Sequence, residues 1–279
     1  MKRRPSKLTS AVFFPFDLFG SGGTAAGVHL LADELREILA DNRREKVPTR
    51  ADAYSPHVRM QEPTFETLDD LAGWRESGRR IANAALKRGD FLLWASGNHL
   101  GVLPVYDELA GDTGTVIVQF DAHLDIHHFR DCTEELSHGN FLLHCAGALP
   151  RLVNVGHRDL LLPAEHVAKT FHAAIPATRL ALDPASVIEE VRAITAKADR
   201  VFLDLDCDVF DPTFFPAVGQ PVPFGPAPAA VLALIDAIWS DRVSGLFVSE
   251  FDPARDREDR SLATLVWLVE YLLVRRYGG

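Results

Sequence analysis

The chain has few cysteines, and their arrangement argues against a disulfide-stabilised or zinc-thiolate protein. The 279 residues contain only Cys132, Cys145 and Cys207. This number is odd, and no Cys-x-x-Cys spacing occurs, so neither a disulfide framework nor a thiolate metal site is indicated. We therefore expect reduced thiols and a cytoplasmic protein.

Long apolar runs are also missing. Lys2, Arg3 and Arg4 precede the apolar run Ala11 to Phe14, but Pro15 and Asp17 interrupt it and no small-residue cleavage site follows. This pattern favours a first β-strand over a signal peptide. No stretch approaches the ~18 apolar residues that a membrane-spanning helix needs.

Basic residues are outnumbered by acidic ones. There are 29 Lys and Arg residues against 39 Asp and Glu, which gives a formal net charge of −10. Sequence-independent binding to nucleic acid or to an anionic membrane needs a basic field, so we expect neither partner. The charge is compatible with a small cationic substrate, although many ordinary enzymes are equally acidic.

No linker or charge block divides the sequence, and we find neither an internal repeat nor a low-complexity tract. With 47% hydrophobic residues, the chain is long enough to bury a large core. We expect a single domain over residues 1–279.

Short β-rich runs alternate with helical patterns, which predicts an α/β fold with a mostly parallel central sheet. The expected strands are Ala11 to Phe16, Phe91 to Ala95, Val116 to Phe120, Leu152 to Val155, Val201 to Leu205 and Gly245 to Val248. The expected helices are Ala25 to Leu39, Leu68 to Lys87, Val102 to Leu109, Asn140 to Ala148, Ala185 to Ala196, Ala227 to Trp239 and Ser261 to Val274. The proline-containing stretch from Glu45 to Glu66 is expected to be a surface excursion outside the sheet.

Oxygen and nitrogen donors recur just after the predicted strands, where open α/β sheets place their ligands. The set comprises His99, Asp121, His123, Asp125, Asp206 and Asp208. Imidazoles and carboxylates without a thiolate favour hard or borderline divalent ions such as Mn(II). The inventory suits a pair of ions that activate water for hydrolysis.

Each cluster also has an ordinary structural explanation. Asp121, His123 and Asp125 could form a solvated loop with a capping carboxylate, and Asp211 before Pro212 is a good turn starter. Neither explanation accounts for acids interrupting an otherwise buried strand at Asp204. Clustered carboxylates there would repel one another without a cation.

These motifs resemble those of the ureohydrolases, the family of arginases and agmatinases. Asn98-His99 resembles part of the family's Gly-Gly-Asp-His-Ser, residues 121–125 match Asp-Ala-His-x-Asp, and residues 204–212 resemble Ser-x-Asp-x-Asp-x-x-Asp-Pro. Glu250 to Pro253 resembles Glu-x-Asn-Pro. The resemblance implies an arginase-like, three-layer αβα fold and two Mn(2+) ions per chain.

The resemblance also assigns ligands and a reaction. One ion would be held by His99, Asp121, Asp125 and Asp206, and the other by His123, Asp121, Asp206 and Asp208. The implied reaction is hydrolysis of a guanidino group to urea and an amine. Asp208 would orient the attacking hydroxide.

Further roles follow from the same resemblance. His138 would shuttle a proton to the leaving amine, although it could equally cap a following helix, and Glu250 would bind the guanidinium. His127 could line the pocket, and Glu134 could receive a cationic tail, although a solvated loop acid is the simpler account.

The chain departs from the family pattern around the substrate. Asn98 replaces an Asp, Asp204 a Ser, and Gln220 a Thr, and the loop after Asp125 lacks the Asn and Ser residues that grip free arginine. The substrate could therefore be free arginine, agmatine or an arginine within a peptide. Alternatives are a formiminoglutamase-like C–N hydrolase, a related one-zinc deacylase and a non-catalytic binding protein. Apolar surface on the C-terminal helix would suit a homo-oligomer.

Overall fold

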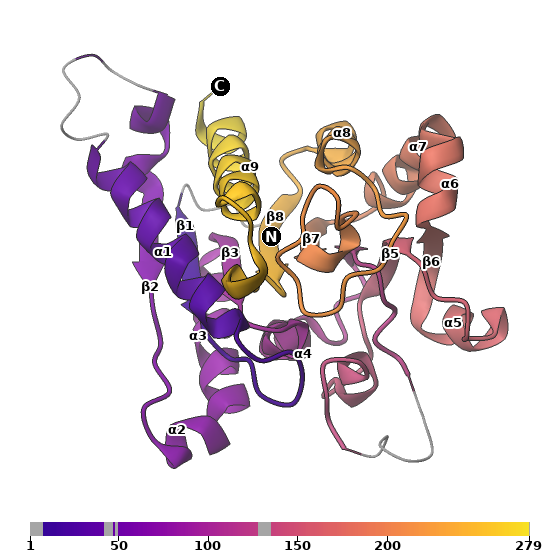
Figure 1. Cartoon of the computed structure of the whole chain (residues 1–279), viewed down its shortest axis with the longest axis horizontal. Coiled ribbons are helices and arrows are strands. Elements are labelled where there is room, and N and C mark those ends of the chain that lie inside the picture. The colour runs from indigo at the N-terminus through magenta and orange to yellow at the C-terminus, as the bar shows by residue number, and fades with distance from the viewer. Residues whose placement is uncertain (1–7, 42–46, 48–49, 128–134, 279) are drawn as a thin grey trace.

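The computed structural model describes residues 8–41, 47, 50–127 and 135–278 (Figure 1). Eight strands of these residues form one parallel sheet in the order β2-β1-β3-β8-β7-β4-β5-β6. The strands are β1 Thr9–Phe14, β2 Val58–Gln61, β3 Phe91–Ser96, β4 Thr115–Phe120, β5 Arg151–His157, β6 Phe171–Pro176, β7 Arg200–Asp206 and β8 Val243–Ser249.

Helices cover both faces of the sheet (Figure 1). They are α1 Thr24–Asp41, α2 Leu68–Ala72, α3 Trp74–Arg88, α4 Leu103–Leu109, α5 Ala164–Thr170, α6 Ala177–Leu182, α7 Pro184–Thr195, α8 Pro228–Ile238 and α9 Arg260–Tyr277. Short 3-10 helices are η1 Arg50–Ala53, η2 Ser55–His57, η3 His99–Val102, η4 Phe141–His144, η5 Cys207–Val209 and η6 Pro253–Arg255.

Two hydrophobic cores lie on the opposite faces of the sheet. Successive strand residues point to opposite faces, so Phe13 joins one core and Phe14 the other. The first core packs against α1, α7, α8 and α9, and the second against α3 and α4. The predicted α/β fold with helices on both faces is confirmed.

The prediction for Glu45 to Glu66 is wrong in part. Val58–Gln61 forms β2, which pairs with β1 from Thr9↔Val58 to Val12↔Gln61. An edge strand needs only one hydrogen-bonded neighbour, and this one has half of its side chains exposed, so its sequence carries little apolar signal.

The helix predicted over Asn140 to Ala148 is also wrong beyond one short turn, η4. The Arg75 guanidinium donates to the carbonyl of His144, and Asp107 Oδ1 accepts from the backbone N–H of Ala146. These bonds hold the chain extended after Cys145, whose ψ is 138°. In addition, the helix predicted from Leu68 to Lys87 divides at Gly73 into α2 and α3, and the sequence reading missed β6, α5 and α6.

No helix in the described part of the chain has the length and apolar character to cross a membrane. Cys145 and Cys207 are free thiols, whereas Cys132 lies outside the described residues.

Candidate metal centre

The candidate site lies at the carboxyl ends of four adjacent strands, β3, β8, β7 and β4. His99 follows β3, Glu250 follows β8 and Asp121 follows β4. Asp206 is the last residue of β7, and Asp208 lies just after it. β3 and β4 are consecutive in the sequence, but β8 and β7 lie between them in the sheet. Ligands bind in open α/β sheets at such a switch in strand order.

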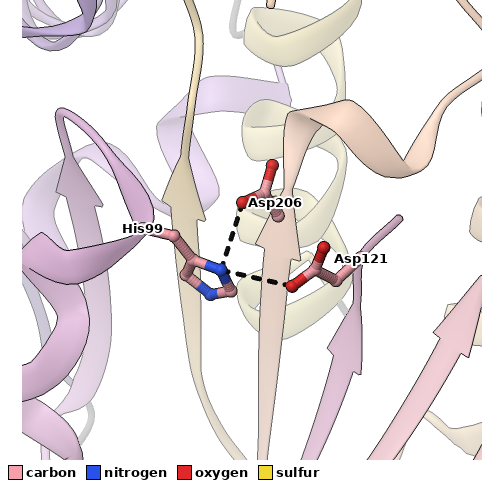
Figure 2. Close-up of side chains that lie close together, drawn as sticks. All are labelled: His99, Asp121 and Asp206. Atoms are coloured by element: carbon pink, nitrogen blue, oxygen red, sulfur yellow. Dashed lines mark ion pairs between the residues drawn. The ribbon is translucent and has the colours of Figure 1, made fainter. Parts of the chain in front are cut away.

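The first group of donors converges on one ring nitrogen of His99. His99 Nδ1 lies 2.8 Å from Asp125, 3.1 Å from Asp206 and 3.3 Å from Asp121, each measured to Oδ2. Figure 2 shows one ring nitrogen of His99 facing the carboxylates of both Asp121 and Asp206. One nitrogen carries at most one proton and cannot satisfy three carboxylates, whereas a cation can.

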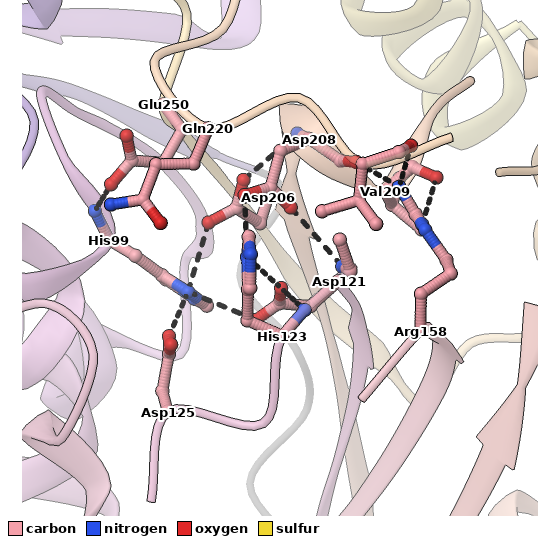
Figure 3. Close-up of polar contacts among 12 residues, drawn as sticks. His99, Asp121, His123, Asp125, Arg158, Asp206, Asp208, Val209, Gln220 and Glu250 are labelled. Carbon is pink, nitrogen blue, oxygen red and sulfur yellow. Dashed lines mark hydrogen bonds and ion pairs between the residues drawn. The ribbon is translucent and has the colours of Figure 1, made fainter. Parts of the chain in front are cut away.

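The second group shares Asp121 with the first. His123 Nδ1 lies 2.9 Å from Asp208 Oδ2 and 3.8 Å from Asp121 Oδ1. The ligand atoms of Asp121, His123 and Asp208 all lie within 4.8 Å of one another, as do those of His99, Asp121 and Asp206. The structure therefore offers two adjoining groups that could each hold an ion (Figure 3).

Backbone hydrogen bonds fix the carboxylates. Asp121 Oδ1 accepts from the N–H of His123 at 2.6 Å, and Asp206 Oδ1 accepts from that of Asp208 at 3.0 Å. Asp208 Oδ1 reaches across to the N–H of Ala122 at 3.1 Å. In Asp206 and Asp208 one oxygen is thus held by the backbone, while the other faces an imidazole.

Unsatisfied buried atoms support a fit to metal. Among the described residues, neither His99 Nδ1 nor Asp121 Oδ2 makes a hydrogen bond of good geometry, although both are buried. Burial, together with the charges of Asp125 and Asp208, raises the pKa of Asp121 to about 7, and burial raises that of Asp206. A bound cation would remove this cost, and the all-oxygen and nitrogen donor set suits Mn(II).

Asp204 supports His99 from behind. Its Oδ2 lies 3.1 Å from His99 Nε2 and accepts the phenolic O–H of Tyr106 at 2.6 Å. A proton on Nε2 leaves Nδ1 free to bind a cation, which is the arrangement that metal-binding histidines adopt. Asn98, by contrast, donates to the carbonyl of Leu18 and lends no side-chain bond to the His99 ring.

Glu250 and His138 form a second polar unit beside the metal groups. Glu250 Oε1 accepts from the His99 backbone N–H at 2.9 Å and lies 3.0 Å from His138 Nδ1. Burial alone would lower the pKa of His138, but the hydrogen bond to Glu250 and the charges of Glu250 and Asp125 together outweigh burial and raise the pKa. His138 Nε2 in turn lies 3.2 Å from the side-chain amide nitrogen of Gln220.

Three of the six described non-glycine residues with positive φ lie at this site. Phe19, Asp125 and Glu250 have φ of 59°, 48° and 64°, in the left-handed region that side chains disfavour. Each such residue costs on the order of 1–3 kcal/mol and persists only where its surroundings enforce it. All three line a cavity of about 780 Å³, which is also lined by His138 and by members of both candidate metal groups, namely His99, His123, Asp206 and Asp208.

The predicted substrate-contacting residues are placed only in part. His127 lines the cavity, and its Nε2 lies 3.3 Å from Asp159 Oδ2. Glu134 lies outside the described residues. Leu161 and Arg255 also line the cavity, and the sequence reading did not single them out.

Comparison with known proteins decides the family. A model described as Arginase family matches residues 10–274. The chain belongs to the arginase family. The resemblance to ureohydrolases is thereby confirmed.

Arginase-family relatives with several specificities are similar to the chain. It is 27% identical to the N(1)-aminopropylagmatine ureohydrolase of Thermus thermophilus over 67% of this chain and 65% of that protein. It is 28% identical to the formimidoylglutamase of Enterobacter over 64% of this chain and 57% of that protein. These two alignments thus span less than two thirds of the relatives' length. An arginase of Brucella melitensis is 24% identical over 90% of this chain and 88% of its own.

Solved arginase-family structures share the fold. A hypothetical agmatinase from Burkholderia thailandensis superimposes with a TM-score of 0.79 at 19% identity, covering 99% of this chain and 88% of its own. An arginase from Bacillus subtilis gives 0.75 at 22% identity, covering 95% of this chain and 98% of its own. The arginase-like three-layer architecture is confirmed.

The sequence reading missed Tyr106 and Arg158, which contact the loops and carboxylates of the centre. Tyr106 lies in an apolar helix and looks like core, because its bond to Asp204 spans 98 positions of sequence. Arg158 carries a clearer signal, since a positive charge directly after the apolar strand β5 lies at the edge where the acids gather.

Proposed function

We propose that the chain is a manganese-dependent amidinohydrolase that cleaves the guanidino group of an arginine-like compound to urea and an amine. The observation that carries this proposal is the meeting of Asp121, Asp125 and Asp206 at His99 Nδ1, next to the group around His123. Two adjoining donor groups suit a pair of ions. Membership of the arginase family supports the same chemistry.

The residues present fit two Mn(2+) ions. By the family resemblance, His99, Asp121, Asp125 and Asp206 would hold the first, and His123, Asp121, Asp206 and Asp208 the second. The spatial groups His99–Asp121–Asp206 and Asp121–His123–Asp208 support this assignment, as does Asp125 at 2.8 Å from His99 Nδ1. When bound, such ions would act as Lewis acids and lower the pKa of a water, which makes it a strong enough nucleophile to attack an unreactive carbon. This is needed because a guanidinium is delocalised and a poor electrophile.

Glu250 and His138 would act on the substrate. Glu250 is buried, and its Oε2 accepts no hydrogen bond from the described residues, so a carboxylate oxygen is open to the N–H groups of a guanidinium. His138 is held at Nδ1 by Glu250 and lines the same cavity. Its imidazole would deliver a proton to the leaving amine.

The test is release of urea from the manganese-loaded protein. L-arginine, agmatine, 4-guanidinobutyrate and arginyl peptides are the substrates to compare, with formamide release from formimino compounds measured in parallel. Urea from one of them, with about two ions per chain, supports the proposal. Formamide alone would favour the formiminoglutamase-like alternative, and no product from a protein with two bound ions would favour a non-catalytic binding protein.

His138→Asn gives the matched mutational test. We expect turnover to fall by roughly 10²- to 10⁴-fold because a general acid is lost, while manganese content stays unchanged. His166→Asn is the control, since the His166 ring does not line the cavity and, among the described residues, its hydrogen bond is to the carbonyl of Ile126 at 3.2 Å. Equal activity of the two variants would remove His138 from the mechanism.

A cytoplasmic location and a homo-oligomeric state stay predictions. Trp267 on α9 is 54% exposed and stacks on Tyr271, so this helix does present an apolar surface.

A further inference from the structure

We propose that Arg158 is a positioning residue for the metal centre, because it ties together three loops of the carboxyl edge. This inference rests on the proposed function, since the centre it would position is the proposed manganese pair. Arg158 follows directly after β5 and is itself neither a donor to a cation nor a cavity-lining residue.

Among the residues that the structure describes, the guanidinium of Arg158 donates only to backbone carbonyls. Nη1 donates to Val209 at 2.6 Å and to Gly156 at 2.9 Å, and Nη2 donates to Asp208 at 2.7 Å and to Val222 at 3.0 Å. We call these four acceptors the Arg158 carbonyl cluster. Figure 3 shows the side chain reaching the Asp208–Val209 turn from the side away from the metal groups.

The backbone of Arg158 adds a link to another loop. Its N–H donates at 2.8 Å to the carbonyl of Ala122, which lies between Asp121 and His123. One residue thus contacts the loops after β4 and β7 and the segment that follows Gln220. Gly156 permits this approach, because its φ is 111° and an added Cβ would lie 2.5 Å from Val209 Cγ2.

The contacts converge on Asp208. Arg158 holds its carbonyl, Asp206 accepts from its N–H, and its Oδ1 accepts from Ala122. These contacts fix the Asp208 carboxylate so that its Oδ2 faces His123. Without the guanidinium, the carbonyls of Asp208 and Val209 would lose their partner and the turn could rotate.

Charge gives a second reason for an arginine at this position. Burial lowers the pKa of Arg158, but an arginine stays protonated under all ordinary conditions. A fixed positive charge beside Asp208 and Asp121 offsets part of their repulsion. Lysine would keep the charge, but its three N–H donors cannot replace the four hydrogen bonds that the planar guanidinium makes to these carbonyls.

The effect is expected to be unequal between the two ions. The group around His123 depends on Asp208 and on the loop of Ala122, both of which Arg158 contacts. His99 lies on η3 and is held by Asp204 and Glu250 instead. Loss of the bonds from Arg158 to the carbonyl cluster should weaken binding of the ion beside His123 and leave the ion beside His99 bound.

The experiment is a manganese titration of Arg158→Lys and Arg158→Gln. Calorimetry measures both dissociation constants, and electron paramagnetic resonance detects the spin-coupled pair. We expect the weaker constant to rise 10- to 100-fold, as for other residues that support ligands, with loss of the coupled signal and retention of one tightly bound ion. Arg158→Lys should retain more affinity than Arg158→Gln.

Arg88→Lys is the control. Arg88 also joins two segments, through Asp90 at 2.7 Å and Ser10 at 3.0 Å, but it lies at the amino edge of the sheet. It should change thermal stability and leave both dissociation constants unchanged.

The outcomes separate the two proposals. If the unaltered protein binds no pair of ions, the proposed function fails, and the role of Arg158 fails with it. If the unaltered protein binds two ions, and the Arg158 variants bind both as tightly or lose both equally, only the positioning role is overturned. Failure of both variants to fold in saturating manganese would likewise overturn it, because Arg158 would then have a general structural role.

Discussion

At the scale of single residues, the two nitrogens of His99 have different tasks. Nδ1 faces three carboxylates and Nε2 faces Asp204, which also accepts from Tyr106. A carboxylate behind a ligating imidazole fixes its tautomer and increases its basicity. The affinity for metal should thus depend on a residue that does not itself face the cation.

We expect Asp204→Asn to weaken manganese binding about tenfold or more, since it removes the charge behind His99 and keeps the shape. Tyr106→Phe is the comparison, because it removes only the hydroxyl and leaves the carboxylate on the imidazole. Its effect on affinity should be smaller. Calorimetric titration measures both, and equal dissociation constants for Asp204→Asn and the unaltered protein would contradict the assignment.

Gly20 offers a test of His138 that leaves every titratable group in place. A Cβ at Gly20 would lie 2.6 Å from His138 Cγ and 2.8 Å from Asn98 Nδ2, whereas a Cβ at Gly22 would meet nothing within 4 Å. Both glycines line the cavity. We expect Gly20→Ala to displace the imidazole and lower turnover at least tenfold, with Gly22→Ala near the unaltered rate. Steady-state kinetics at fixed manganese content would decide.

The clustering of the candidate metal donors could be predicted at this scale, because these residues fall in short motifs after apolar strands, whereas their role as ligands stays a prediction. The partners of Tyr106, Arg158 and Gln220 could not be predicted, because these contacts join positions 98, 51 and 82 apart in sequence. A single sequence carries no sign of such pairings until the fold brings them together.

At the scale of elements, the start of α9 is held by a residue outside the helix. Asp256 accepts from the backbone N–H groups of Ser261 and Leu262, each at 3.0 Å, while Asp259 at the N-cap position makes no such bond. Burial raises the pKa of Asp256, but these bonds, together with the one from the Arg257 N–H at 2.8 Å, outweigh burial and lower the pKa below the ordinary value. The carboxylate form is therefore the stabilising one.

Asp256→Asn should lower the free energy of unfolding by about 0.5–2 kcal/mol at neutral pH, as loss of a helix cap does. A lowered folded pKa means that this contribution is present above the unfolded pKa, about 4, and is lost as pH falls through the folded value. The two proteins should thus converge in stability below about pH 4. Glu258→Gln, at an exposed pair with Arg260, should change little at any pH. Urea denaturation at several pH values provides the measurement.

Elements with a buried apolar pattern were predictable, and elements held by tertiary contacts were not. The six predicted strands all occur, because each is buried on both faces or nearly so. β2 was not predicted, because it is a short edge strand. The helix predicted from Asn140 is only the short η4, because Arg75 and Asp107 bind the chain that follows it. Local propensity was overridden there by partners more than 30 positions away.

At the scale of the molecule, the order of strands assembles the centre. The first half of the chain supplies β3 and β4, which stay separated until β7 and β8 fill the gap between them. His99 and Asp121 thus meet Asp206 only when the sheet is complete. Burying these carboxylates together lowers the stability of the whole fold, and a bound cation would offset this loss.

This cost predicts a reversal of stability for Asp121→Asn. Without metal the variant should be about 1 kcal/mol more stable than the unaltered protein, because a buried charge among like charges is removed. With manganese at 100 times its dissociation constant the unaltered protein gains about 2.7 kcal/mol that the variant cannot, so the order inverts. Asp112→Asn, which breaks the pair with Arg200 at the other edge, should be destabilising in both conditions. Thermal unfolding with chelator and with manganese measures all three, and an order that stays the same in both would contradict the idea that a cation offsets the buried charge.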